Sequence, residues 1–263
     1  MAPFYITTPI YYVNDVPHLG HAYTTVAADA FARFHRALGT PTWFLTGTDE
    51  HGQKIQDAAT ERGLTPIAHA DQVVERFRNT WTNLHISHDD FIRTTEPRHR
   101  QVVKDMWRRL EQAGDIYLGA YEGPYCKSCE AYYTEGQLAP GNLCPTHKQP
   151  VTLVKEPAFF FRLSKYQDRL IRHFADHPDF VLPKVRRNEI LSFVESGLRD
   201  LCVSRTTFSW GIPVPDRPEH VIYVWIDALT NYISALGGPG AAAYEQFWPA
   251  TCHLIGKAIL RFH

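Results

Sequence analysis

Two histidines flank a glycine near the start of the chain, in His18-Leu19-Gly20-His21. They stand where a short β-rich run gives way to a helical apolar pattern. The first turn of a helix carries unpaired N–H groups and the positive dipole end, so it attracts phosphate. The imidazoles add donors to this space, and Gly20 removes a side chain that would hold a nucleotide away. This predicts a nucleotide site that stabilises charge on phosphorus; a chance pair, one histidine a helix cap, is the alternative for these four residues alone.

Three cysteines and a histidine form a second group, with the metal-ligand spacing C-x2-C-x14-C-x2-H. Paired ligands on two tight turns can close a tetrahedron of three thiolates and one imidazole around structural Zn²⁺. No position is then left for water, so the ion would stabilise and not catalyse; unligated thiols are the alternative. The other two cysteines stand apart, which is a poor disulfide framework. The expected ligands are Cys126, Cys129, Cys144 and His147.

The composition indicates a folded protein with no global preference for nucleic acid. The chain has 263 residues, 44% of them hydrophobic, and a formal net charge of −1. That length can bury one large core, or one core plus a small inserted module. The near-zero charge means that any polynucleotide contact must be local. No run approaches the roughly 18 apolar residues of a membrane span and the N-terminus lacks signal-peptide regions, so we expect a cytoplasmic protein without membrane contact.

The elements that must position these groups alternate between strand and helix. Short β-rich runs are followed by loops and then by apolar residues at helical spacing. Such alternation predicts a parallel sheet covered by helices on both faces, that is, a doubly wound α/β domain. The expected strands are residues 4–8, 42–46 and 90–94, with a loop at 47–52; the expected helices are 20–38, 53–59, 66–84 and 103–113.

The alternation of expected strands and helices stops near residue 116 and resumes after residue 204. The region between them contains the cysteine group and aromatic runs such as Phe159-Phe160-Phe161. We therefore expect three parts: a first half of the catalytic domain at 1–115, a connective insertion at 116–204 with a zinc knuckle at about 121–151, and the start of the second half at 205–263.

Several long motifs, in order, carry a resemblance to a known family. They are FYITTPIYYVNDVPHLGHAYTTVAADAFARFHRALG, FLTGTDEHGQKI, RRNEILSFVESGLRDLCVSRTTFSWGIPVP, YVWIDALTNYI and HLIGKAILRFH. Together they resemble the catalytic domain of class I methionyl-tRNA synthetases from residue 4 to residue 263. The resemblance implies a Rossmann-like doubly wound fold of the HIGH-motif nucleotidyltransferase type, with an inserted zinc-knuckle connective domain. It also implies activation of methionine by ATP with Mg²⁺, followed by transfer of methionine to tRNA.

The resemblance also implies roles for individual residues. His18 and His21 would contact the ATP phosphates in the transition state, and Gly20 would pack under the adenosine. Arg205 would lie near the reacting groups, and Lys257, in a separate motif, would lie on the ATP side. Asp49 would hold the ammonium group of methionine; a loop-capping aspartate is the alternative for this residue without the family. The apolar pocket for the thioether would comprise Ile10, Tyr12, Trp225, Ala228, Leu229, Tyr232, Ile259 and His263.

Two departures from the family pattern affect the expected activity. The motif GKAIL has Ala258 where the family has an acidic residue. The sequence stops before the KMSKS-type lysine loop that grips pyrophosphate and before the anticodon-binding domain, so we expect a truncated catalytic region. Adenylation should then be slow or lost, and only the acceptor end of initiator and elongator methionine tRNAs could be bound. A sheet cut before its last strands would expose an apolar edge, which indicates a partner or a fragment.

Three functions remain open from the sequence. The first is a methionine–tRNA ligase catalytic domain with impaired autonomous activity. The second is a stand-alone paralogue that adenylates or amidates a small acceptor. The third is a non-catalytic methionine-binding module that retains the pocket and the zinc knuckle without turnover.

Overall fold

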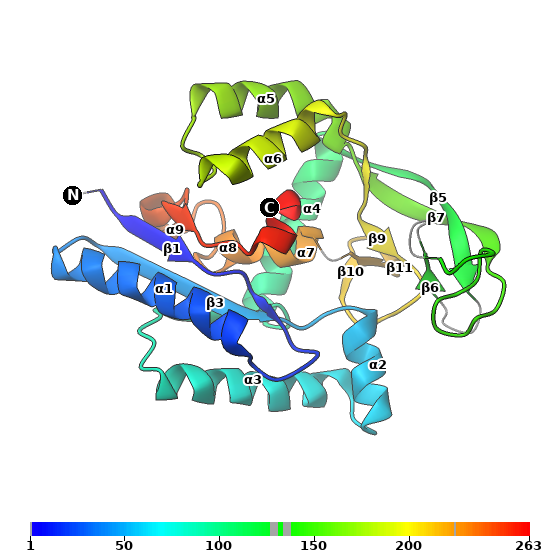
Figure 1. The fold of residues 1–263 in the computed structure, drawn as a ribbon, viewed down its shortest axis with the longest axis horizontal. Helices are drawn as coiled ribbons and strands as arrows, with labels where there is room; N and C mark the ends of the chain where they lie inside the picture. Colours follow the sequence, from blue (N-terminus) through cyan, green and yellow to red (C-terminus); the bar gives the residue numbers. More distant parts are fainter. Residues whose placement is uncertain (1, 127–130, 134–137, 224) are drawn as a thin grey trace.

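A five-stranded parallel sheet forms the centre of the molecule in the computed structural model, which describes residues 2–126, 131–133, 138–223 and 225–263 (Figure 1). β1 lies in the middle, with β3 on one side and β12 on the other, and both β2 and β4 pair with β3. The chain therefore reverses its direction of sheet growth beside β1, and ligands of open α/β sheets bind at such a reversal. The strands are β1 (Phe4–Thr7), β2 (Tyr11–Tyr12), β3 (Thr42–Asp49), β4 (Asp90–Arg93) and β12 (Cys252–His253).

The two faces of the sheet are covered by different helices. Because side chains alternate along a strand, Phe4 and Ile6 point to the face covered by α1 (Leu19–Ala37), where they pack with Phe44. Tyr5 and Leu45 point to the opposite face and pack against α8 (Asn231–Ser234) and α9 (Ala242–Phe247). This arrangement confirms the expected parallel α/β fold.

A second core forms beside the sheet under α2 (Gln53–Glu61) and α3 (Pro66–Asn83). Phe77 and Trp81 of α3 are fully buried there and pack with Tyr11 and Ile55. Thr65 caps α3 by accepting the backbone N–H of Ala68, and the proline at its first position fixes the entry of the chain. The core holds the segment that leads from β2 to the paired histidines.

The segment expected to be an insertion contains an antiparallel sheet and two helices (Figure 1). Its long hairpin pairs Ile116 with Phe161 at one end and Tyr125 with Thr152 at the other. The elements are β5 (Ile116–Cys126), β6 (Ala131–Tyr132), β7 (Thr152–Phe161), β8 (Leu201–Cys202), a 3₁₀ turn at Leu163–Tyr166, α5 (Gln167–Asp176) and α6 (Lys184–Glu195).

A small three-stranded sheet and short helices connect this segment to the parallel sheet. Its order is β10–β11–β9, and all of its pairs are antiparallel. Trp107 of α4 packs with Phe159, Ile212 and Ile222, so one core joins α4 to both antiparallel sheets. The remaining elements are α4 (Pro97–Gln112), β9 (Ser204–Arg205), β10 (Ile212–Val214), β11 (Arg217–Ile222), α7 (Trp225–Leu229) and the 3₁₀ helix η3 (Lys257–Phe262).

The structure departs from the sequence expectation at three places, one of which is α4, which begins at Pro97 and not at residue 103. β3 continues to Asp49, so the loop expected from residue 47 begins later, at the strand's end. The larger apolar residues of α1 face outward: Val26, Phe31 and Phe34 are 46%, 51% and 59% exposed. The inward face is made of smaller residues, including Thr25 and Ala28. None of the helices in the described ranges has both the length and the apolar composition needed to cross a bilayer.

Candidate active site

His18 and His21 cap the first turn of α1 with their own side chains. His18 has extended backbone geometry and its Nδ1 accepts the backbone N–H of Gly20 at 3.1 Å. Nδ1 of His21 accepts the backbone N–H of His18 at 3.2 Å, which completes a reciprocal capping box. The rings stack with centroids 3.7 Å apart. The capping interpretation and the functional interpretation of the pair are therefore compatible.

The capping bonds fix which ring nitrogen carries the proton. Since both Nδ1 atoms accept, each neutral ring carries its hydrogen on Nε2, where it can be donated to a ligand. Burial, and then the neighbouring His18, lower the pKa of His21 to about 4. His21 is thus neutral near pH 7 and would act as a hydrogen-bond donor, without a full charge.

The structure gives a second reason for a glycine at position 20, which sequence reasoning did not find. A Cβ atom at this position would lie 3.0 Å from Cε1 and 3.1 Å from Nδ1 of His18. A side chain here would displace the capping imidazole. The glycine therefore maintains the histidine geometry in addition to its expected contact with a nucleotide.

Asp49 is the last residue of β3 and lines a small pocket. Burial and the nearby charge of Asp227 raise the pKa of its carboxyl to about 8, whereas His51 lowers it. A cation that enters the pocket would favour the ionised form of this carboxyl and would pair with it. The other residues that line the pocket are His51, Gly52, Phe208, Ile222, Tyr223 and Asp227.

Tyr12 is tied to the loop that follows Asp49. Its hydroxyl donates to the backbone carbonyl of His51 at 3.1 Å. A Cβ atom at Gly52 would lie 2.9 Å from this hydroxyl, and Gly52 also has a φ of +107°, so a glycine is required there. Tyr12 and Asp49 are also adjacent in register, because β2 pairs with β3 through them.

The residues expected to form the methionine pocket come mostly from one cluster. Ile10 and Leu229 pack with the buried Tyr232, and Tyr232 shares a hydrogen bond of 2.9 Å with Nε2 of His263. His263 Nδ1 also lies 3.0 Å from the carbonyl of Ile259. Ala228 is buried one helix turn before Tyr232. The sequence-predicted residues 10, 228, 229, 232, 259 and 263 are thus contributed by the residues after β1 and by three short helical segments, α7, α8 and η3 with its C-cap.

Trp225 stacks on an aromatic residue that the sequence did not identify. Its ring lies parallel to that of Phe262, with centroids 4.3 Å apart and an interplanar angle of 3°. His263 approaches Trp225 edge-on at 6.4 Å. These rings form an apolar, aromatic surface beside Tyr232, and such a surface suits a thioether.

Arg205 is held between two aromatic rings. Its guanidinium carbon lies 4.7 Å from the ring centre of Tyr121 and 4.3 Å from that of Tyr223. Tyr223 lines the Asp49 pocket, so Arg205 lies directly behind this wall. Its Nη1 also contacts Cys202 Sγ at 2.6 Å and the carbonyl of Ser204 at 3.0 Å. The arginine expected to be near the reacting groups is therefore adjacent to the pocket.

Lys257 is exposed at the start of η3. Its charge helps to lower the pKa of Glu189 on α6, after the larger effect of Arg186. The structure thus places Lys257 beside α6.

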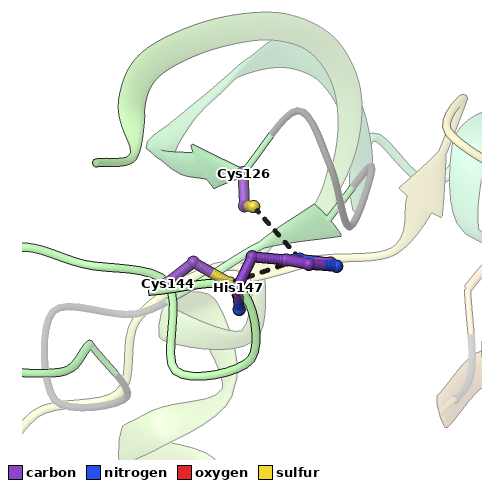
Figure 2. Close-up of side chains that lie close together, drawn as sticks. All are labelled: Cys126, Cys144 and His147. Carbon is purple, nitrogen blue, oxygen red and sulfur yellow. Dashed lines mark hydrogen bonds between the residues drawn. The ribbon is translucent and has the colours of Figure 1, made fainter. Parts of the chain in front are cut away.

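Three of the four expected metal ligands lie together (Figure 2). Cys126 Sγ and Cys144 Sγ are each 4.0 Å from Nδ1 of His147. Ligand atoms of a tetrahedral zinc site are roughly 3.5–3.8 Å apart, given the usual bond lengths, so this arrangement needs only a slight contraction. Cys129, the fourth expected ligand, lies outside the described residues. The donor set of buried thiols and an imidazole fits Zn²⁺.

Two groups of buried polar residues near the site were missed by sequence reasoning. Asp227 joins His51 and His99, which are 176 and 128 residues away in the chain. Glu50 is fully buried and receives both Nε and Nη2 of Arg93, at 2.7 and 2.9 Å. The run Asp49-Glu50-His51 after a buried strand was the available indication, but nothing local identified the partners.

Comparisons with known proteins identify the family of this chain. The family model described as tRNA synthetases class I (M) matches residues 4–152 and 142–263. The chain is 56% identical to a methionine–tRNA ligase of Rickettsia conorii over 261 residues, covering 99% of this chain and 51% of the relative. It is 54% identical to one of Caldanaerobacter subterraneus, covering 99% of this chain and 41% of the relative.

Solved structures give the same result. A methionyl-tRNA synthetase of Mycobacterium tuberculosis bound by methionyl-adenylate matches with a TM-score of 0.90 and 47% identity, over 99% of this chain and 53% of that one. Its free form matches with a TM-score of 0.80 and 44% identity, over 100% of this chain and 51% of that one. The chain spans about half the length of these relatives. It belongs to the methionyl family of class I tRNA synthetases.

Proposed function

We propose that this chain is the catalytic region of a methionine–tRNA ligase, which activates methionine with ATP to methionyl-adenylate and transfers it to tRNA. The observation that carries the proposal is the Asp49 pocket with its aromatic neighbours, in a chain that superposes on a methionyl-adenylate-bound relative with a TM-score of 0.90. Two further points support it: the paired histidines cap a helix at the reversal point of a parallel sheet, and the motifs match in order.

In this proposal the methionine ammonium group binds the Asp49 carboxylate. The thioether lies against the aromatic surface of Trp225 and Tyr232, with His263 and the apolar residues already described around it. This arrangement leaves the carboxylate of methionine to attack the α-phosphorus of ATP. Positioning and charge stabilisation then account for catalysis, without a covalent enzyme intermediate.

His18 and His21 would donate from Nε2 to the phosphate oxygens as charge develops on phosphorus. Because their Nδ1 atoms are engaged by the backbone, the donors are preorganised before ATP binds. Gly20 would allow the adenosine to approach the helix, Arg205 would add a cation near the reacting groups, and Lys257 would lie on the ATP side. Mg²⁺ would accompany the ATP phosphates and neutralise part of their charge.

We further propose that residues 116–204 form a connective insertion between two halves of the catalytic domain, at 1–115 and 205–263. Cys126, Cys129, Cys144 and His147 would hold a structural Zn²⁺ in that insertion. The acceptor end of a methionine tRNA is the partner we expect for this chain, and the cytoplasm is the expected location.

Methionine-dependent exchange of labelled pyrophosphate into ATP by the purified 263-residue chain tests the proposal, with methionine binding by calorimetry in parallel. We expect methionine binding that is strongly weakened in D49N, and slow exchange that depends on His21. Absence of both methionine binding and exchange in the unsubstituted chain would contradict the proposal. Methionine binding without exchange would support the binding-module function instead.

A further inference from the structure

We propose that His51, anchored through Asp227 to His99, is a positioning residue that favours the ionised form of the Asp49 carboxyl, the form that binds the methionine ammonium group. The inference deepens the proposed function and rests on it, because it concerns how the same pocket recognises the amino group. The three residues come from different parts of the chain: the loop after β3, α4 and α7.

The anchor is a buried chain of hydrogen bonds. His51 Nδ1 lies 2.7 Å from Asp227 Oδ2, and His99 Nε2 lies 2.9 Å from Asp227 Oδ1. His99 Nδ1 continues the chain to Ser234 Oγ at 2.8 Å. The side chains of His51, Asp227 and His99 are 6%, 2% and 0% exposed. Since water cannot solvate these groups freely, their partners determine their ionisation.

The two ends of the chain have different protonation requirements. Asp227 accepts at both oxygens, so each histidine must present an N–H to it. His99 can do so with Nε2–H alone when the Ser234 hydroxyl hydrogen goes to its Nδ1 at 2.8 Å and not to the more distant Asn231 carbonyl at 3.3 Å. Among the residues that the structure describes, the His51 ring hydrogen-bonds only through Nδ1, so its second nitrogen can carry a proton as well. The carboxylate of Asp227 outweighs burial and raises the pKa of His51.

The charge count explains why this matters for Asp49. Asp49 and Asp227 both line the pocket, and two carboxylates alone would oppose each other's ionisation. A protonated His51 leaves a single net negative charge on the three groups, and an ammonium ion neutralises it. The backbone of His51 also hydrogen-bonds the Asp49 carboxyl, which favours the ionised form. His51 therefore favours the ionised form of Asp49, and Asp49 makes the contact with the methionine ammonium group.

Other charged groups around the pocket do not supply this role. Glu50 is neutralised by the bidentate contact with Arg93, which also reaches Asp71. Arg100 opposes protonation of His51 and acts from the α4 side. Tyr12, whose pKa is raised by burial and then by Asp49, stays neutral. Tyr223 and Asp57 also raise the pKa of Tyr12.

The test compares methionine binding by calorimetry at pH 6–9 for the unsubstituted chain and H51N. Asparagine retains a donor at the Nδ1 position and removes the positive charge. A rise of about one pH unit in the Asp49 midpoint weakens methionine binding about ninefold at pH 7 and only about twofold at pH 9. At each pH we compare the dissociation constant of H51N with that of the unsubstituted chain. The titration of methionine affects both constants equally and therefore drops out of their ratio. The matched control is H69Q, since His69 is equally buried on α3 and Gln retains its donor to the Val13 carbonyl.

A ratio that falls with pH in H51N, with H69Q unchanged, is the expected result. A ratio that is the same at every pH would mean a purely structural role and would overturn the inference while leaving the proposed function intact. No methionine binding by the unsubstituted chain at any pH would overturn both. Should H51N fail to fold, ¹⁵N NMR of the imidazoles in the unsubstituted chain decides: a doubly protonated His51 at pH 7 is expected, and a neutral one overturns the inference.

Discussion

His18 and His21 stack with their ring centroids 3.7 Å apart, and Nδ1 of His21 accepts the backbone N–H of His18. The same atoms that cap α1 therefore orient the rings. Nδ1 has a structural task and Nε2 is left for a ligand, so the two tasks can be separated by substitution.

Replacement of His21 by asparagine should separate capping from phosphate contact. The asparagine oxygen can accept at the Nδ1 position, but no donor remains at the Nε2 position. We expect pyrophosphate exchange to fall about 10²-fold or more, the magnitude of a lost transition-state donor. The thermal midpoint should change little. Glutamine at the same position should do the reverse, with a loss of stability near 1 kcal/mol from the broken cap; equal losses of rate and stability in both variants would contradict this division.

Gly20→Ala should reduce activity through His18. The new Cβ would lie 3.0 Å from Cε1 of His18, so the imidazole must move. Displacement of a positioned group by about 1 Å costs on the order of 10²-fold in rate, so a shift of a few tenths of an ångström should lower the rate roughly severalfold. Alanine's better helix propensity offsets part of the lost cap, so the free energy of unfolding should change by no more than about 1 kcal/mol. Steady-state exchange kinetics and a denaturant titration measure the two effects; an unchanged rate would show that His18 is only a cap.

Methionine affinity should rise with pH between 6 and 8. The carboxyl of Asp49 has its pKa raised to about 8 by burial and by Asp227, so below that pH it is mostly protonated and cannot pair with an ammonium ion. Affinity should therefore increase by about tenfold per pH unit well below the pKa and level off above it. Calorimetry across this range tests the slope. D49N should bind methionine weakly at every pH and without the slope, and a flat profile in the unsubstituted chain would refute the assignment.

The purified chain should contain about one equivalent of zinc, measured by elemental analysis. C144S should lose the metal and lower the thermal midpoint, because a structural ion contributes directly to folding. C252S is the matched control, since Cys252 lies in β12 of the parallel sheet, outside the cysteine and histidine cluster. Retention of zinc in C144S, or loss of zinc in C252S, would place the metal elsewhere.

Local sequence determined much of this protein. The paired histidines and Gly20 at a strand-to-helix junction predicted the capped turn of α1, because capping and helix periodicity depend on residues within a few positions. The spacing of Cys126, Cys144 and His147 predicted their cluster because it is a recognised spacing of metal ligands. The alternation of strands and helices predicted the parallel α/β fold, although it ended β3 too early.

Contacts between distant segments were decided only by the tertiary structure. Asp227 meets His51 and His99 because the end of β3, α7 and α4 converge, and no periodicity links residues 176 and 128 positions apart. The tertiary structure also decided which face of α1 is buried. The helix approaches the sheet closely, so small residues such as Ala28 face the sheet and the larger Phe31 and Phe34 face outward. Sequence thus determined which groups could do chemistry, and packing determined which buried charges control them.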